Sequence, residues 1–510
     1  MEIPIGMFSL SRSSRQNNLL YLFCLILSLV VTTSKAQVRQ INQIEIPLNL
    51  WEDASQYKIL STGEQGLLFI RRFSGNTIDQ MLITHLDTLL NKQWENSIPI
   101  PRFAVTVTEQ IRNNIAYFLL KDRAEFLLIS IQVSDGAYML TSIKNPLLFN
   151  PTELSVSDDV ILIGGYYNQR PLVFYYNFKQ QKSKILPGLF NEVGELNQIK
   201  INDEGSIQVI VCAKNWDQRK SLWIRTYDTD GNLVKTTLLK PDPDKNLIFG
   251  KSFDLGNGKE VVLGSYGRYI EYARGIFSAE INLEGEPKIT YHNFGDLQRF
   301  FGYLKPKHEA RVMERNERRK LKGKKLRYNY HYVVNDIIPH RDEFILLGEV
   351  FYPRYTYSSM GNSSFSGNSY MRSQPIFDGY QYSHAIVAGF DKKGKLLWDN
   401  SFKMDHVKTM TLQQFVKILP FENKLDMLYV NDNSLNSKTI LETNVIKNTV
   451  TTTLYDSNPK NTFTELSKLE NWYGDYLFAY GALLIVNPVQ QDGTRTTKRV
   501  FYISKILCQE

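Results

Sequence analysis

The sequence predicts an all-β protein, a β-propeller of about eight four-stranded blades, with seven blades as the alternative. Three observations lead to this prediction. Strand-like apolar runs recur at a nearly constant spacing, a second turn motif recurs in phase with them, and the first strand-like segment can complete the last repeat. A string of separate β-sandwiches and a non-closing β-solenoid are the alternative architectures.

The N-terminal segment has the pattern of a secretory signal peptide. Arg12 and Arg15 precede the apolar run Leu19–Val31, and Ser34 and Ala36 are the small residues of a cleavage site. A basic start, a short apolar core and a small-x-small site are typical of export signals. The apolar run has 13 residues, fewer than the roughly 18–20 that a stable membrane-spanning helix needs.

Cleavage at this site divides the chain into a signal peptide, residues 1–36, and a single propeller domain, residues 37–510. The mature protein is then not expected to span the membrane. An uncleaved membrane anchor is one alternative. Lipid attachment at Cys24 is another, but Cys24 follows Leu-Phe instead of the small residues of lipidation signals. The remaining cysteines, Cys212 and Cys508, are too few for a disulfide scaffold. A single bridge between them stays open beside a buried free thiol at Cys212.

Eight apolar runs form the main repeat, and a polar turn precedes each of them. Such turns lead into runs of β-branched and aromatic residues, which is the pattern of a strand. Successive runs begin 48, 45, 47, 54, 83, 81 and 52 residues apart, and a propeller blade takes about 40–50 residues. Each of the two long spacings contains an insert of unusual composition. The first large apolar residues of the runs are Leu67, Ile115, Val160, Ile207, Val261, Phe344, Leu425 and Leu477.

A second turn motif recurs in phase with the first. The segment His85–Ile98 aligns without a gap on Gly389–Phe402. The matched pairs are Asp87 with Asp391, Trp94 with Trp398, Asn96 with Asn400, and Ser97 with Ser401. Because side chains alternate along a strand, the common offset from the turn puts both tryptophans on the same relative face of their sheets. We expect them to pack between neighbouring blades and not to be exposed as platforms for sugars.

The two ends of the chain are predicted to close the ring. The eighth repeat ends with the strand-like segment Arg499–Leu507 and leaves no chain for an outer strand. The segment Gln40–Leu50 precedes the first repeat and has the composition of a strand. A strand from one end that completes the blade at the other removes a sheet edge and locks the array.

The segment Ile386–Phe402, preceded by Phe351–Tyr355 and a Tyr-rich stretch, resembles exported propeller-like proteins of the Bacteroidetes. The end of the signal segment, Ser34–Gln37, is typical of the same group. The resemblance covers the middle of the chain and loosely the rest, and the group is mostly uncharacterised. It implies a Gram-negative envelope setting and no activity. On this resemblance the protein is expected in the periplasm, at the outer membrane, or secreted.

The first insert, residues 298–327, is strongly basic. It contains 12 Lys and Arg against 3 Glu, a net charge of +9, whereas the whole chain carries +8. Pro306 and Gly323 predict a helix between them, over residues 307–322. Anionic lipid, lipopolysaccharide phosphate or an acidic envelope protein is the expected partner, because an exported protein seldom meets nucleic acid. A solvated helix without a partner is the alternative. The candidate contact residues are Arg311, Arg315, Arg318, Arg319 and Lys320.

The second insert, residues 352–382, is rich in Tyr, Ser, Gly and Asn. This composition is typical of adaptable recognition loops, because Tyr offers apolar area and a hydroxyl at small entropic cost. Aromatic faces also suit the rings of a glycan. A loop that folds back on its blade is the alternative. The candidate contact residues are Tyr355, Tyr357, Tyr370, Tyr380 and Tyr382. Because both inserts fall in the same or adjoining blades, we expect them to share a face.

No catalytic, metal-binding or cofactor-binding motif is present, so no residue is predicted to be catalytic and no cofactor is expected. The run from Asp228 resembles a calcium loop but lacks its distal Glu, and a turn explains it better. Two functions stay open. The first is a non-catalytic binding or scaffold protein of the cell envelope that uses the two inserts. The second is a carbohydrate-active enzyme with carboxylates gathered at the propeller axis. Acidic residues at strand ends of one blade are Asp336, Asp342 and Glu343.

Overall fold

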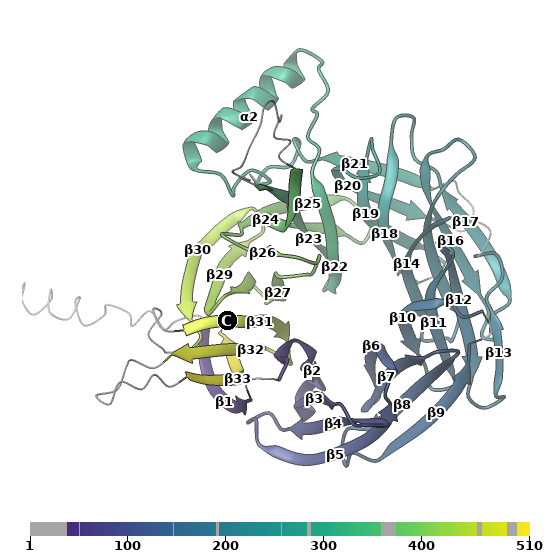
Figure 1. Cartoon of the computed structure of the whole chain (residues 1–510). Helices are drawn as coiled ribbons and strands as arrows, with labels where there is room; N and C mark the ends of the chain where they lie inside the picture. The colour runs from purple at the N-terminus through teal and green to yellow at the C-terminus, as the bar shows by residue number, and fades with distance from the viewer. Residues whose placement is uncertain are drawn as a thin grey trace, which may run out of the picture.

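The computed structural model describes residues 38–49, 52–145, 147–189, 193–256, 258–282, 287–358, 374–455, 462–486 and 497–509. Eight antiparallel sheets, each built on four consecutively paired strands, are arranged around a ring (Figure 1). The predicted eight-bladed propeller is therefore confirmed, and the alternative of seven blades does not hold. The predicted signal peptide lies outside the described residues.

The first four blades follow each other along the chain, with the innermost strand first. Blade 1 consists of β2 (Lys58–Ser61), β3 (Leu67–Phe73), β4 (Ile78–Leu86) and β5 (Lys92–Pro101). Blade 2 consists of β6 (Val105–Arg112), β7 (Ile115–Asp122), β8 (Glu125–Gln132) and β9 (Tyr138–Lys144). Blade 3 consists of β10 (Asn150–Val156), β11 (Val160–Tyr167), β12 (Arg170–Asn177) and β13 (Lys182–Ile185). Blade 4 consists of β14 (Gly194–Ile201), β15 (Ile207–Lys214), β16 (Lys220–Tyr227) and β17 (Leu233–Leu239).

The remaining blades include the two long repeats and the closure. Blade 5 consists of β18 (Asn246–Asp254), β19 (Glu260–Gly267), β20 (Ala273–Ile281) and β21 (Lys288–Asn293). Blade 6 consists of β22 (His331–His340), β23 (Glu343–Ser358), β24 (Gln374–Asp391) and β25 (Leu396–Lys403), and the short β26 (Lys408–Thr409) also pairs with β24. Blade 7 consists of β27 (Lys417–Pro420), β28 (Leu425–Asn431), β29 (Ser434–Leu441) and β30 (Asn444–Thr453). Blade 8 consists of β31 (Thr462–Asn471), β32 (Tyr476–Val486), β33 (Thr497–Cys508) and β1 (Val38–Leu48). The described helical segments are η1 (Ala54–Gln56), η2 (Gly63–Gln65) and α2 (Pro306–Leu321).

The eight apolar runs of the sequence are the second strands of the eight blades. Each marker residue, from Leu67 in β3 to Leu477 in β32, is the first or second residue of its strand. A second strand is covered by neighbouring blades on both faces, so it reads as a continuous apolar run. In β11, for example, the six residues Val160–Gly165 are all buried.

The predicted closure is confirmed. Strand β1 pairs with β33 from Val38 opposite Cys508 to Leu48 opposite Arg499, so the start of the chain supplies the outer strand of the last blade. The adjoining interface is aromatic: Phe501 of blade 8 stacks on Phe69 of blade 1 with 5.3 Å between ring centroids. Closure therefore joins main-chain pairing within blade 8 to side-chain packing against blade 1.

The second turn motif makes the same contacts in both of its best copies. Oδ1 of Asp87 accepts hydrogen bonds from the amides two and four residues later, both at 2.8 Å. Asp391 does the same at 2.9 and 2.8 Å. Oδ1 of Asp228 accepts from the amide four residues later at 2.7 Å, which supports the turn interpretation of that segment. Within the described residues, no group of three or more His, Cys, Asp or Glu could hold a metal ion.

Both motif tryptophans pack at blade interfaces, as predicted. Trp94 contacts the apolar cluster between blades 1 and 2, and Trp398 belongs to the cluster between blades 6 and 7. Cys212 and Cys508 are both buried and free, so the bridge between them does not form.

The basic insert is a helix with a buried approach. Helix α2 spans Pro306–Leu321, and Gly323 follows with φ of +64°, close to the predicted bounds. The sequence assigned Gln298–Leu304 to the same solvated insert, but this part packs into the core. Phe300 and Phe301 are buried there. The carboxylate of Asp399 accepts hydrogen bonds from the backbone amides of Gln298 and Arg299. Among the described residues, no helix is long and apolar enough to cross a membrane.

Candidate functional site

The two inserts emerge on one face of the propeller, as expected. In every blade the first and third strands run in the same direction, so fourth-to-first and second-to-third connections lie on the same side of the ring. Helix α2 lies in the fourth-to-first connection between β21 and β22, and the Tyr-rich insert extends the second-to-third connection between β23 and β24. We call this side the insert face, and Figure 1 shows α2 at its rim beside blade 6.

The Tyr-rich insert is in part an extension of the sheet. Strands β23 and β24 stay paired from Glu343 opposite Asp391 out to Ser358 opposite Gln374. We call the outer part of this pair, Tyr352–Ser358 and Gln374–Gln381, the aromatic arm, and its tip is the end at Ser358 and Gln374. Because its tip passes beyond the neighbouring strands, its side chains are exposed: Tyr355 is 51% exposed and Tyr357 is 69% exposed. Tyr370 lies outside the described residues.

The predicted tyrosines of the arm have different environments. Tyr355 and Tyr380 both pack edge-to-face on Phe377, with ring centroids 5.9 and 5.0 Å away. Tyr382 is only 1% exposed, and its hydroxyl donates to the carbonyl of Gln413 at 2.8 Å. Tyr382 therefore anchors the root of the arm, and the surface available to a partner is near its tip.

Additional exposed apolar and charged residues surround the arm. Ile376 within the arm and Met410 and Leu412, which follow β26, are exposed, although the sequence did not single them out. Asp378 forms an ion pair with Lys408 at 2.6 Å, and its carboxylate lies 3.5 Å from the Arg354 guanidinium. The aromatic rings thus lie next to polar groups that can hydrogen-bond a hydroxylated ligand.

The basic residues of α2 are exposed, while one polar residue fixes the helix. Four of the predicted contact residues, Arg311, Arg315, Arg318 and Arg319, are exposed. Lys320 forms an ion pair with Asp296 at 2.7 Å, and this carboxylate partly neutralises its charge. Asn316 of the same helix is only 2% exposed and accepts a hydrogen bond from the Tyr328 hydroxyl at 2.6 Å.

The approach to the helix and the root of the arm form one packed unit. Tyr303 stacks on His384 of β24, with 3.7 Å between centroids and 7° between ring planes. Burial lowers the pKa of His384 to about 3, so the imidazole is neutral at physiological pH. Phe300 packs edge-on against the same ring at 5.1 Å. The helix and the arm are therefore connected through a rigid aromatic cluster.

A buried carboxylate lies at the root of the arm. Oε1 of Glu349 accepts hydrogen bonds from the amides of Phe415 and Val416 at 3.0 and 2.6 Å, which ties β23 to the connection that enters blade 7. Burial raises the pKa of Glu349 to about 7, although these hydrogen bonds oppose the shift. Sequence reasoning missed this site because Glu349 lies within an apolar strand.

Several acidic groups of the innermost strands are paired across blades. Glu109 of β6 pairs with Lys58, Asp336 of β22 lies 3.9 Å from Lys251, and Glu470 of β31 lies 2.5 Å from a lysine of β27. Burial raises the pKa of the inner-strand residue Glu153 to about 7. These ion pairs connect blade 1 to blade 2, blade 5 to blade 6 and blade 7 to blade 8.

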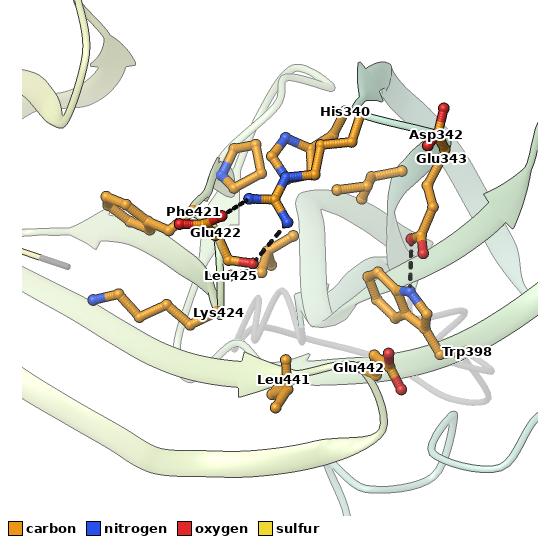
Figure 2. A pocket seen from close by; sticks show the side chains of 13 residues that line it. His340, Asp342, Glu343, Trp398, Phe421, Glu422, Lys424, Leu425, Leu441 and Glu442 are labelled. Carbon is orange, nitrogen blue, oxygen red and sulfur yellow. Dashed lines mark hydrogen bonds and ion pairs between the residues drawn. The ribbon is translucent and has the colours of Figure 1, made fainter.

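A pocket of about 330 Å³ opens between blades 6 and 7 on the face opposite the inserts. Figure 2 shows Glu343 and Trp398 on one side of it and Phe421, Glu422 and Leu425 on the other. The Trp398 indole N–H donates to the Glu343 carboxylate at 3.0 Å. Asp342 and Glu343, which the sequence singled out as acidic residues at strand ends, both line this pocket. Asp336 does not line it.

No protein-family model and no curated protein matches the chain. Solved structures match at the level of the fold. A dihydro-heme d1 dehydrogenase is 11% identical, with a TM-score of 0.42 over 92% of this chain and 82% of the other. A polysaccharide lyase is 9% identical, with a TM-score of 0.40 over 79% and 90%. The β-propeller domain of the Trilobed protease from Pyrococcus furiosus is 10% identical, with a TM-score of 0.36 over 78% and 95%.

Proposed function

We propose that this protein is a non-catalytic binding protein that holds an anionic glycan on its insert face at blade 6. The observation that carries the proposal is that the exposed aromatic side chains of the arm in blade 6 lie on the same face of the propeller as the basic helix, which leads into that blade. Aromatic rings bind the apolar faces of sugars, and arginines bind phosphate or carboxylate groups in a bidentate manner. An anionic glycan is the partner that uses both features.

The charge distribution supports an anionic partner. The insert of residues 298–327 has a net charge of +9 and the whole chain has +8, so the remainder of the chain is nearly neutral. Four of the helix arginines, Arg311, Arg315, Arg318 and Arg319, are exposed. A concentrated positive patch on a neutral body attracts anions and orients them toward one face.

The proposal includes export to a Gram-negative cell envelope. Its support is the signal-peptide pattern of residues 1–36 and the resemblance to exported propeller-like proteins. In that compartment, phosphorylated lipopolysaccharide and acidic polysaccharides are the anionic glycans at hand.

Binding to immobilised lipopolysaccharide, to its dephosphorylated form, to a polyuronate and to neutral dextran tests the function. We expect saturable binding to both anionic glycans, weakening with added salt because salt screens exposed charges. Tyr355→Ala with Tyr357→Ala, and separately Arg311, Arg315 and Arg319→Glu, should each weaken binding about tenfold, equivalent to about 1.4 kcal/mol.

Matched controls separate these effects from general surface changes. Tyr138→Ala with Tyr269→Ala removes two exposed tyrosines outside the arm, and Lys144, Lys182 and Lys235→Glu reverses three exposed charges on outer strands. Both control sets should bind like the wild type. Equal binding of neutral dextran, or no saturable binding of either anionic glycan, would refute the proposal.

A further inference from the structure

The interface between blades 1 and 2 contains Trp94, the residue that matches Trp398 of the pocket between blades 6 and 7, so the two places can be compared. In that interface, Trp94 donates its indole N–H to the carbonyl of Val133 in blade 2, at 2.9 Å. Residues 133–137, which connect β8 to β9, cover the indole. A Cβ atom added at Gly136 would lie only 2.8 Å from the Trp94 ring, so this connection packs directly on it. At the Trp94 indole, the space between these two blades is therefore filled by the β8–β9 connection of blade 2.

The equivalent connection of blade 7 is much shorter. Strand β29 ends at Leu441 and β30 begins at Asn444, so only residues 442 and 443 join them. The conserved geometry of the motif is otherwise retained, because Asn96 donates to the Gly136 carbonyl and Asn400 donates to the Glu442 carbonyl. The pocket lies next to this short turn, and both Trp398 and Glu442 line it.

Two residue differences reorient the blade 6 indole. Glu343 directly precedes Phe344, the first large apolar residue of its run, and Gly66 is at the same position in blade 1. Gly389 aligns with His85. A Cβ atom at Gly389 would lie 2.2 Å from the Trp398 indole nitrogen, so only glycine permits this position of the ring. The indole N–H then bonds the Glu343 carboxylate of its own blade instead of a carbonyl of the next.

The lining of the pocket combines apolar contacts with negative charge. Arg341 is paired with Glu422 at 3.2 Å, and the ammonium of Lys424 lies 4.6 Å over the Phe421 ring. Within the described part of the chain, the Glu442 side chain makes no hydrogen bond or ion pair. The charged lining residues are the acids Asp342, Glu343, Glu422 and Glu442 and the bases Arg341 and Lys424. Apolar surface comes from Ile345, Trp398, Leu425 and Leu441.

We propose that this pocket binds a small organic cation, an ammonium or guanidinium group carried on an apolar chain. The carboxylates of Glu343 and Glu442 hold the charged group by charge-assisted hydrogen bonds, and the indole and aliphatic residues receive the chain. A volume of about 330 Å³ suits a ligand of this size. The site lies on the face opposite the glycan surface, so the two binding activities are independent.

Saturation-transfer NMR with n-pentylammonium and 1-pentanol tests the proposal, since the two probes have the same chain and differ in charge. We expect saturable binding of pentylammonium and at least about tenfold weaker binding of pentanol, because a hydrogen bond to a charged group contributes about 1.5–3 kcal/mol. Equal binding of the two probes would overturn the cation assignment. Tighter binding of methyl glucoside than of pentylammonium would overturn it in favour of a sugar site.

The variants Glu343→Gln and Glu442→Gln retain the size of each side chain and remove its charge. Each should weaken pentylammonium binding about fivefold or more, and the double variant should abolish it. Glu64→Gln, an exposed acid in the corresponding turn of blade 1, is the matched control and should bind as the wild type does. Unchanged binding in the double variant would refute the site. Lipopolysaccharide binding should stay unchanged in all three variants, so failure here is distinct from failure of the glycan proposal.

Discussion

The two motif tryptophans at the blade interfaces make different contacts although they occupy matched positions. Trp94 and Trp398 occupy matched positions, yet the first is half-buried and bonds the next blade, whereas the second is 7% exposed and bonds its own. The contacts of each indole are therefore set by the neighbouring blade as well as by the motif.

Trp398→Ala should destabilise the protein more than Trp94→Ala. Removing a buried tryptophan costs about 3–5 kcal/mol, and a half-buried one costs less. Denaturant unfolding of both variants measures the free energies of unfolding. Trp216→Ala, at a side chain that is 80% exposed, is the control and should have little effect. Comparable stability of Trp398→Ala and this control would show that the indole does not support the interface.

The buried carboxylate of Glu349 predicts a pH-dependent stability. Its pKa is raised to about 7 from an ordinary value of 4.5. Its contribution to stability is therefore complete below about pH 4.5 and is lost as the pH rises through about 7. The side chain of Glu349→Gln does not titrate, so the wild type should lose stability relative to this variant between pH 5 and 8.

Denaturant unfolding of both proteins across this range measures that difference. A raised pKa of this size corresponds to a change on the order of 1–3 kcal/mol. Glu64→Gln, at an exposed position, should show no such change relative to the wild type. A difference between wild type and Glu349→Gln that stays constant with pH would contradict the shifted pKa.

Among the elements, α2 is docked on the propeller without joining its sheets. Val312 and Met313 pack against the aromatic cluster between blades 5 and 6, and Asn316 is buried beneath the helix. It contacts the propeller through these side chains and is not part of a sheet. Its docking sets the position of the arginines relative to the arm, and this position is what the proposed glycan site requires.

Replacing residues 307–325 with a short Gly-Ser linker should leave the propeller intact. The far-ultraviolet circular dichroism of the strands should be retained, and the unfolding midpoint should fall by only a few degrees as the helix contacts are lost. Thermal unfolding measures this change. A drop larger than about 5 °C, at least 1–2 kcal/mol for a chain of this size, would show that the helix is part of the structural core.

The whole molecule depends on closure of the ring. Strand β1 pairs with the outer edge of β33 from Arg499 to Cys508, and the clusters between blades continue across the joint between blades 8 and 1. An open edge of this kind invites pairing with other chains. Closure thus protects the last blade and fixes the inner strands around the axis.

A chain that begins at residue 49 should be much less stable than one that begins at residue 37. Loss of β1 exposes the outer edge of β33 and the apolar side chains of blade 8 that face it. We expect the unfolding midpoint to drop by more than about 10 °C, with concentration-dependent association through the open edge. Calorimetry and sedimentation velocity of the two chains measure both effects. Equal midpoints would show that closure is dispensable.

The sequence by itself determined the repeat, the closing strand and the approximate bounds of the helix, and it favoured eight blades over seven. These features follow from local patterns: apolar runs after polar turns, Asp-initiated turns, and Pro and Gly at helix ends. Each pattern depends on residues close together in the chain, so it can be detected without knowledge of the packing.

Only the tertiary structure decided which residues of the two inserts are accessible. Tyr357 and Tyr382 look alike in the sequence, but Tyr382 belongs to the buried cluster between blades 6 and 7, and its hydroxyl bonds the carbonyl of Gln413, 31 residues later. Similarly, Glu343 lies beside Trp398 across 55 residues. Burial depends on strand register and on the neighbouring blade, and these bring together segments far apart in the chain.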